Sequence, residues 1–567
     1  MKLRKWMSLY FVLFSVKFFS QNSSNRAAVD VATKTIRPAE IRAHIRFLAD
    51  SLLQGRAPGT PGYDIAARYV ATELEGMGLH PAAEAGNWFQ TVPLEKAVTD
   101  ASASSFVLTT SGKEQKLTDA KDYILSTWFA SPASNGDSKV EADVSAPVVF
   151  VGFGVTAPDQ KYDDYAGVDV HGKIVAGIYG APSSFPSTER AYYSDGVVKA
   201  RNAVAHGAIG VISIMLPEDW KRYPWEWLVP QIQVGEMHWL DKKGVPHDFF
   251  PELRGNVLLS QQGADKLFAG APKTLDQVFA AAKAGKPQAF TLPVSARIHT
   301  VAAHSVINSS NIVAELKGSD PALRDQYVVY TAHVDHLGIC PAVAGDNVCH
   351  GALDNASGTS TLLEIARAYA SLPQAPRRSV LFVFVTGEEM GLLGSDYFAH
   401  YPTVPLKAIV ANVNIDGAPG SYFGMKDVVA LGAEHSTIGD EVAAAAKEMG
   451  YDVSPDPMPE EVSFIRSDQY SFVLQGVPAV DVEDGVHATD PKISGLDVIK
   501  KWLVTRYHTP LDNMDQPIDF DSTAKGAVMN FLVGYQIAQH EAAPQWNKGD
   551  FFGTTFGPRH SAASTGE

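Results

Sequence analysis

The apolar positions of the chain follow two periods, and these periods predict its elements. Between residues 311 and 540, short continuous apolar runs alternate with stretches in which apolar residues recur every three or four positions. Short runs are typical of buried strands, and the wider spacing is typical of helices packed on a core. We predict strands at 311–316, 327–332, 380–386, 408–415 and 478–482, and helices at 357–370, 391–400, 437–449 and 524–540. This alternation predicts an α/β fold, a mostly parallel central sheet with helices on both faces.

The pattern changes in the first half of the chain. Two helices are predicted near the start, one from Pro38 to Leu53 and one beginning near Ile65. From about residue 142, short strands separated by Gly and Pro turns follow one another, which predicts a β-rich insert. The predicted organisation is a leader at 1–25, a first part of the main domain at 26–141, the insert at 142–293, the rest of the main domain at 294–543, and a flexible polar tail at 544–567.

Length and charge narrow the function classes. With 567 residues, the chain is too long for one core and fits two or three domains. Its hydrophobic and charged fractions, 45% and 19%, are ordinary for a globular enzyme. A formal net charge of −16 argues against a nucleic-acid partner. The oligomeric state is not readable from these totals.

The first residues predict export. Lys2, Arg4 and Lys5 precede an apolar run at 6–19, the order of a secretory signal peptide. The run is short for a membrane span, so no stable membrane insertion is expected once the signal is removed. We therefore expect a periplasmic or extracellular protein. The alternative is an uncleaved anchor.

The chain contains two cysteines, Cys340 and Cys349, in the loop that follows the strand at 327–332. In an exported protein such a pair suggests a disulfide that closes the loop. Two free thiols or two soft metal ligands are the alternatives.

Candidate metal ligands follow the predicted strands. The strand at 327–332 ends in His333-Val334-Asp335-His336, the strand at 380–386 ends in Gly387-Glu388-Glu389, and the strand at 408–415 runs into Asp416. Asp354 lies in a turn after the first of these strands, and His508 comes late in the chain. Ligands bind at the carboxyl ends of parallel strands. Imidazole and carboxylate together suit zinc, and two zinc ions about 3.5–4 Å apart can share one carboxylate and hold one hydroxide.

Each candidate taken alone has a structural explanation. Glu388 and Glu389 could start a helix, Asp354 could cap the helix at 357–370, and His333 could be a buried histidine at a strand end. His336 follows the ligand motif, and we assign it a supporting or structural role. The case for chemistry rests on all five ligand types occurring in one order.

That order resembles the di-zinc aminopeptidase and glutamate carboxypeptidase family of metallopeptidases. The matching motifs are His333-x-Asp335, Gly351-Ala352-x-Asp354-Asn355, Gly387-Glu388-Glu389, Asn414-x-Asp416 and Tyr507-His508-x-Pro510-x-Asp512. The resemblance implies a zinc exopeptidase fold of the phosphorylase/hydrolase-like type, and it implies that the insert is a protease-associated domain.

The resemblance also implies a role for each matched residue. His333 and Asp416 would bind one Zn²⁺, Glu389 and His508 would bind the other, and Asp354 would bridge the two ions. Glu388 would be the general base, Asp335 would hydrogen-bond the far nitrogen of His333, and Tyr507 would stabilise the oxyanion.

The expected activity is that of an exported aminopeptidase that attacks a peptide substrate with a bridging metal hydroxide. Within the family, a carboxypeptidase or dipeptidase for acidic substrates is the alternative, with Arg466 as its obvious anion-binding candidate. A receptor-like relative without catalysis and a one-zinc cyclising acyltransferase are further alternatives. Metal counting and product analysis separate them.

Overall fold

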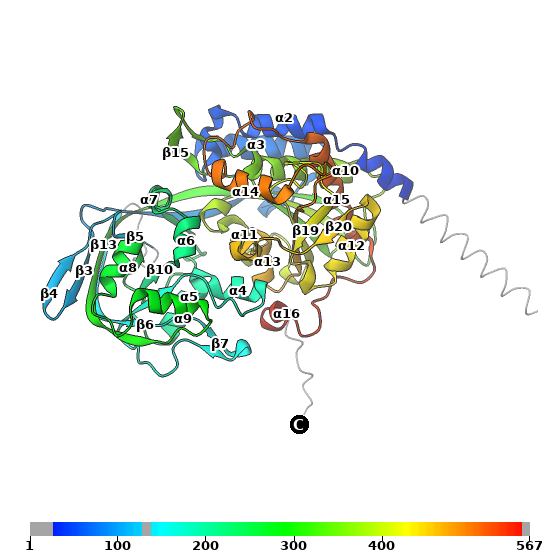
Figure 1. Cartoon of the computed structure of the whole chain (residues 1–567). Helices are drawn as coiled ribbons and strands as arrows, with labels where there is room; N and C mark the ends of the chain where they lie inside the picture. Colours follow the sequence, from blue (N-terminus) through cyan, green and yellow to red (C-terminus); the bar gives the residue numbers. More distant parts are fainter. Residues whose placement is uncertain (1–25, 128–137, 558–567) are drawn as a thin grey trace, which may run out of the picture. The chain divides into compact units, whose positions relative to one another are not determined.

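The computed structural model describes residues 26–127 and 138–557, and these residues form two compact units. Unit 1 comprises the described residues up to Gln90, Ser310–Pro457 and the described residues from Ser467 onward. Unit 2 comprises the described residues of Thr91–Ser309 together with Met458–Arg466. Figure 1 shows the elements of both units.

Unit 1 is built on a mixed sheet whose centre is parallel. Strands β17 (Ser379–Val385), β14 (Tyr327–His333), β18 (Ile409–Asn414) and β21 (Ala479–Asp484) lie side by side in this order and run in the same direction. The end of β13 (Phe290–Leu316) and then β1 (His80–Pro81) extend one edge antiparallel. On the other edge, β19 (Asp427–Leu431) pairs antiparallel with β21, and β20 (Asp452–Ser454) follows. The predicted parallel sheet is therefore confirmed, with antiparallel edges.

Helices cover both faces of this sheet. Side chains that alternate along β14 and β17 enter one core, which they share with the first group of helices. That group is α2 (Pro38–Leu48), α3 (Pro61–Gly76), α10 (Gly358–Ala370), α12 (Ile438–Met449) and α15 (Phe520–Gln539). Helices α11 (Leu393–His400) and α13 (Gln469–Leu474) pack on each other, with the rings of Phe398 and Phe472 6.1 Å apart, and α13 contacts β18 and β21. The predicted helices and strands of unit 1 match these ranges to within a few residues, except that α2 ends at Leu48.

Helix α15 packs tightly against the central strand β14. Gly534 lies so close to β14 that an added Cβ would stand 1.9 Å from the hydroxyl of Tyr330. This hydroxyl donates to the carbonyl of Asn530 at 2.9 Å. The buried Arg378 donates to the carbonyls of Ile537 and Glu541, both at 2.9 Å, and so satisfies the end of the helix. Burying each large aliphatic side chain in this core contributes about 1.5–3 kcal/mol.

Unit 2 has its own mixed sheet. Its order is β4 (Lys113–Lys116), β3 (Ser105–Thr110), the first part of β13, β6 (Ser138–Phe150), β9 (Ile174–Ile178), β10 (Gly210–Ile214), β12 (Asn256–Leu259) and β5 (Tyr123–Ser126). Strands β2 (Phe89–Thr99) and β11 (Glu236–Trp239) pair with each other. Its helices are α4 (Ser187–Ser194), α5 (Gly196–Ala205), α6 (Pro217–Arg222), α7 (Trp225–Gln233), α8 (Gln261–Leu267) and α9 (Leu275–Lys283).

The boundaries of unit 2 correct the predicted organisation. The insert was expected at 142–293, but the compact unit begins at Thr91 and ends at Ser309. The reason lies in strand pairing, because β13 pairs with β3 on one side and with β6 on the other. Residues before 142 and after 293 are therefore part of the same sheet.

The expected flexible tail is also wrong for residues 544–557. They are ordered against unit 1, where Trp546 donates to the carbonyl of Gly476 at 3.0 Å and Asp550 lies 2.6 Å from Nδ1 of His435. Helix α16 (Phe551–Thr555) buries Phe552 completely. The prediction followed the polar, Gly-containing composition of this segment and gave too little weight to its few aromatic residues. The remaining tail, 558–567, and the predicted signal peptide lie outside the described residues.

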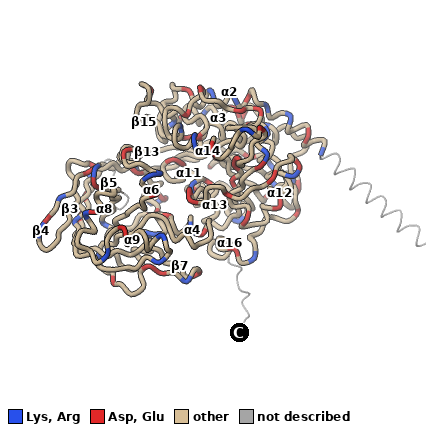
Figure 2. The backbone as a smooth tube through the Cα atoms, in the orientation of Figure 1, with Lys and Arg blue, Asp and Glu red and all other residues tan. Residues whose placement is uncertain are grey.

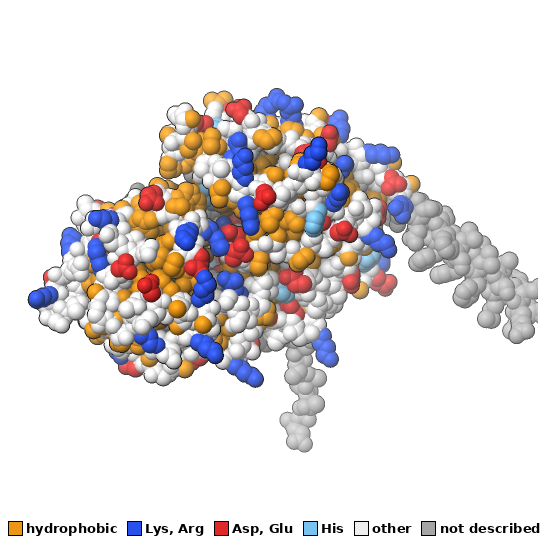
Figure 3. Space-filling model, in the orientation of Figure 1, with side chains coloured by type: hydrophobic (Ala, Val, Ile, Leu, Met, Phe, Trp, Pro, Cys, Tyr) orange, Lys and Arg blue, Asp and Glu red, His pale blue; other side chains and the backbone are white. Residues whose placement is uncertain are grey.

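Basic and acidic residues are interspersed along the described chain (Figure 2). On the face drawn in Figure 3, acidic and basic groups stand among apolar ones. Among the described residues, we find no helix with the length and apolar character that crossing a bilayer requires.

Candidate metal centre

Three neighbouring strands of unit 1 end at the same place and carry predicted ligands there. His333 is the last residue of β14, which lies between β17 and β18. Nε2 of His333 lies 3.1 Å from Oδ1 of Asp416, two residues past β18, and 3.4 Å from Oδ1 of Asp354. The predicted ligands of the first ion are therefore together.

The predicted ligands of the second ion also converge. Nε2 of His508 lies 3.0 Å from Oε2 of Glu389 and 3.3 Å from Oδ2 of Asp354. Asp354 thus presents one carboxylate oxygen to each set. Each of the five side chains is at most 26% exposed, and the side chain of His333 is fully buried.

These residues fit a pair of zinc ions. Ligand atoms on one tetrahedral zinc are about 3.3 Å apart, given bonds of about 2.0 Å. The donor distances of 3.0–3.4 Å match this spacing. In addition, Oδ2 of Asp354 is buried and accepts no hydrogen bond. A buried, unbonded carboxylate oxygen facing imidazole nitrogens is a place for a cation.

The loop that carries Asp354 is tied to the loop that carries Asp416. The side chain of Asn355 donates to the carbonyl of Ile415 at 2.9 Å and accepts from the amide of Gly417 at 2.9 Å. Ser357 accepts from the amide of Ala418 at 3.0 Å. The peptide bond between Asp354 and Asn355 is cis. Asn355 and Ser357 therefore shape this turn.

Two polar residues that the sequence left without a role hold this region together. The carboxylate of Asp512 accepts from the amides of Leu353 and Asp354, at 3.0 and 3.1 Å. The buried guanidinium of Arg56 donates to the carbonyls of Val334, His350 and Gly351, at 2.8, 2.7 and 3.0 Å. Arg56 therefore joins the end of β14 to the start of the Asp354 loop. An arginine in a Gly- and Pro-rich stretch gives no sequence signal for such a role.

The carboxylate of Asp335 has a different contact from the predicted one. Its Oδ1 lies 3.9 Å from Nδ1 of His333, beyond hydrogen-bond distance. Its carbonyl oxygen lies 3.2 Å from that nitrogen instead. The carboxylate accepts from the amides of Glu388 and Glu389 at 3.3 and 3.4 Å. Asp335 thus orients His333 through its backbone and orients the Glu388–Glu389 turn through its side chain.

Glu388 lies beside the first set of ligands, with Oε2 3.8 Å from Nε2 of His333. Burial raises the pKa of Glu388 well above its usual range; nearby His333 opposes this shift and Asp416 adds to it. A carboxyl group with a raised pKa is a stronger base than a free glutamate. This is the property that a proton acceptor at this position needs.

Electrostatics in the second set favour a positive charge. Burial alone would lower the pKa of His508, but the carboxylates of Glu389 and Asp354 raise it to about 10. In the surroundings of the first set, burial raises the pKa of the fully buried Asp468 to about 7, with His333 opposing the shift and Asp416 adding to it. Around the two ligand sets, carboxyl groups outnumber the two histidines His333 and His508.

Tyr507 stacks on a predicted ligand. The centre of its ring lies 3.7 Å from that of His508, with 24° between the ring planes, and the ring of Trp502 lies 5.4 Å from that of Tyr507. Trp502 in turn donates to Gln516, whose amide donates to Asp512. The predicted oxyanion donor is thus held in a fixed orientation beside His508.

The two cysteines form a disulfide between β15 (Gly338–Val343) and β16 (Asp346–Cys349), with Cα atoms 5.8 Å apart. The predicted disulfide is confirmed, and free thiols and metal ligation are excluded. Gly55 packs on this hairpin so closely that a Cβ would lie 2.5 Å from the carbonyl oxygen of Cys349. Gln469, the first residue of α13, accepts from Asn414 at 3.1 Å.

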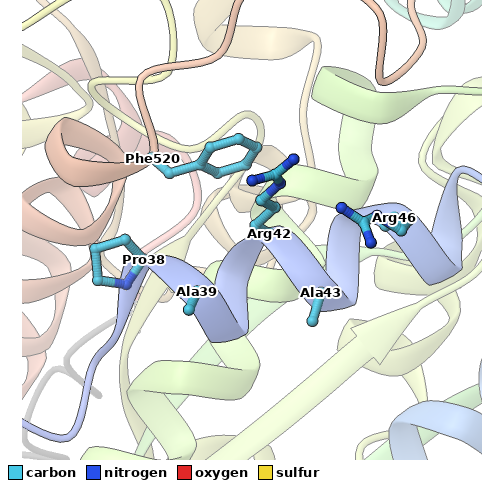
Figure 4. A pocket seen from close by; sticks show the side chains of 6 residues that line it. All are labelled: Pro38, Ala39, Arg42, Ala43, Arg46 and Phe520. Carbon is cyan, nitrogen blue, oxygen red and sulfur yellow. The ribbon is translucent and has the colours of Figure 1, made fainter.

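A separate hollow of about 290 Å³ lies on α2 (Figure 4), where the Arg42 guanidinium stands 5.8 Å from the centre of the Phe520 ring. Its lining shares no residue with the five ligands. The lining residues are Pro38, Ala39, Arg42, Ala43, Arg46 and Phe520.

Comparisons with known proteins agree with this site. Residues 311–531 match the sequence profile described as Peptidase family M28. This part of the chain is therefore an M28 peptidase domain.

Among curated proteins, aminopeptidase YwaD of Bacillus subtilis is 28% identical over 244 residues, which are 42% of this chain and 46% of that protein. Aminopeptidase NAALADL1 of Rattus norvegicus is 36% identical over 115 residues, 19% of this chain and 14% of that protein. The matched segments thus cover less than half the length of these relatives. Among solved structures, an aminopeptidase from Aneurinibacillus sp. strain AM-1 has a TM-score of 0.52 at 22% identity, covering 90% of this chain and 96% of that one, and shows a shared fold.

Proposed function

We propose that the chain is an exported zinc aminopeptidase that hydrolyses the N-terminal peptide bond of peptide substrates. The observation that supports this most is the placement of Asp354 between two sets of donors, His333 with Asp416 and His508 with Glu389. The M28 relatives named above are aminopeptidases, which supports the same direction.

The site residues divide the work in this proposal. Two Zn²⁺ ions, when bound, supply a nucleophilic water and polarise the scissile carbonyl. Glu388 accepts the proton of the attacking water and passes it to the leaving amine. Tyr507, fixed on the ring of His508, donates to the oxygen on which charge develops.

The carboxypeptidase alternative has less support. One relative is named a probable glutamate carboxypeptidase, AMP1 of Arabidopsis thaliana, at 29% identity over 192 residues. Recognition of an acidic substrate needs a cationic anchor, and Arg466 was its candidate. Arg466 already donates to the carbonyl of Glu461 at 3.4 Å and lies 3.9 Å from its carboxylate.

We further propose that unit 2 is a protease-associated domain and that the chain works outside the cytoplasm, as a periplasmic or extracellular enzyme. The leader pattern of the sequence and the disulfide support export. The proposal includes neither a nucleic-acid partner nor a membrane anchor once the signal peptide is removed.

A panel of short peptides with free carboxyl termini, each with a free or an N-acetylated amino terminus, tests the direction. The zinc-loaded protein is expected to hydrolyse only the substrates with free amino termini, to lose this activity with a chelator, and to regain it with zinc. Hydrolysis of the blocked peptides from the carboxyl end, read by mass spectrometry, would replace the proposal by the carboxypeptidase alternative.

A further inference from the structure

A second histidine stands behind Glu389. His336 is fully buried, and its Nδ1 lies 2.5 Å from Oε1 of Glu389. The other oxygen of the same carboxylate, Oε2, faces His508 at 3.0 Å. The two oxygens of Glu389 are therefore engaged by two different imidazoles.

The distances separate the two histidines by role. His508 and Glu389 have the spacing of two ligands on one zinc ion, which is about 3.3 Å. A separation of 2.5 Å is too short for two ligands of one ion, and it places the two atoms in a direct, short hydrogen bond. Nδ1 of His336 also lies 3.9 Å from Oδ2 of Asp354, farther than a shared ion would place it. A carboxylate can only accept, so Nδ1 of His336 carries the proton and donates it.

The surroundings fix the ring of His336 in this orientation. The backbone amide of His336 donates to the carbonyl of Arg56 at 3.3 Å. Gly351 presses on the ring so closely that an added Cβ would stand 2.6 Å from its Cγ. Its Nε2 is buried and has no hydrogen-bond partner. Within the described part of the chain, the polar partners of this ring are Glu389, at hydrogen-bond distance, and Asp354, 3.9 Å away.

We propose that His336 is a positioning residue that occupies Oε1 of Glu389 and so restricts this ligand to one oxygen, Oε2, toward the second zinc ion. This inference rests on the proposed two-ion site. A glutamate with both oxygens available can bind an ion through both and fill the coordination position that a catalytic zinc keeps open. Holding one oxygen back preserves that position and raises the affinity of the second site, as hydrogen-bonded partners of ligands do.

The test compares three variants of the full-length protein by zinc titration against a chromogenic chelator. Asn can place its amide N–H where Nδ1 lies, so His336→Asn is expected to bind the second zinc within about threefold of wild type. His336→Leu removes the donor, and its second zinc is expected to bind about 10–100-fold more weakly while the first is unchanged. The control His44→Leu changes another buried histidine of unit 1, which contacts Tyr69 at 2.7 Å, and should leave both affinities unchanged.

The visible absorption of the Co²⁺-loaded forms reports coordination independently of activity. A change in the spectrum of the second ion in His336→Leu, restored in His336→Asn, supports the inference. Unchanged zinc affinity and an unchanged spectrum in His336→Leu overturn the inference. An equal loss of affinity for both zinc ions also overturns it. If His336→Leu does not fold, His336→Gln takes its place, since its amide reaches past Oε1 and is expected to bind the second zinc at least tenfold more weakly than His336→Asn. A wild-type protein that binds fewer than two zinc ions would instead overturn the proposed function.

Discussion

The carboxylate of Asp512 accepts the backbone amide of Asp354 at 3.1 Å, so a residue outside the ligand set fixes the shared ligand. In Asp512→Asn, one acceptor oxygen becomes an N–H group that faces the amides of Leu353 and Asp354. We expect zinc to bind about 10–100-fold more weakly and the fold to lose about 1–3 kcal/mol, because a buried donor is left unpaired. Zinc titration and urea unfolding measure both effects. The exposed Asp515→Asn is the matched control, and wild-type zinc affinity in Asp512→Asn would remove this role.

Variants of Glu388 and of its neighbour Glu389 distinguish the role in proton transfer from the role in metal binding. In Glu388→Gln, turnover is expected to fall about 10²–10⁴-fold with two zinc ions retained, because only the proton acceptor is lost. The same isosteric change at Glu389 is expected to reduce the zinc content. Atomic absorption and turnover on one preparation of each variant check the pair. If Glu388→Gln keeps full activity, the base lies elsewhere.

The disulfide closes the hairpin that packs on Gly55 and leads into the Asp354 loop. Replacing both Cys340 and Cys349 by Ser is expected to destabilise unit 1 by about 2–4 kcal/mol, because the unfolded chain gains conformational freedom. Urea unfolding of the zinc-loaded protein measures this. A reducing agent should lower the wild-type midpoint toward that of the double variant, without effect on the variant. Equal midpoints in all four samples would show that the hairpin holds without the bond.

Unit 2 offers a pH test on a histidine that is not one of the predicted metal ligands. Burial lowers the pKa of His238 to about 4, while its Nδ1 lies 3.0 Å from the carbonyl of His247. In the unfolded chain, a histidine titrates near 6.5. Between these values only the unfolded state takes up the proton, so the free energy of unfolding falls as the pH drops from about 6.5 to about 4.

The variant His238→Asn removes this titration while its amide can still donate to His247. The free energy of unfolding, measured by urea titration across this range, should then depend on pH less steeply. The difference in slope corresponds to at most one bound proton. The exposed His171→Asn in the same unit should keep the wild-type slope. A slope in His238→Asn equal to that of wild type would contradict the assignment.

Much of unit 1 could be predicted because its signals are local. The apolar runs that became β14, β17 and β18 are largely buried, and a side chain with metal-binding chemistry stands at the end of each strand or within four residues after it. The parallel order then brings those ends together. His333, Glu389 and Asp416 converge for this reason, although they are far apart along the chain, and Asp354 and His508 reach them from loops.

What could not be predicted depends on partners remote in sequence. The extent of unit 2 follows from the 27-residue strand β13, which pairs with strands on either side of the expected boundary. Arg56 binds backbone carbonyls, which no residue pattern reveals. The side chain of Asp335 turns to the amides after β17, a choice set by a turn geometry that the sequence does not show.

The account depends on two cations that share Asp354. Crystals of the zinc-loaded protein, measured on both sides of the zinc absorption edge, locate these ions directly by anomalous scattering. We predict two peaks about 3.5–4 Å apart, one beside His333 and Asp416 and one beside His508 and Glu389. A single peak, or two peaks that do not both contact Asp354, would contradict the account.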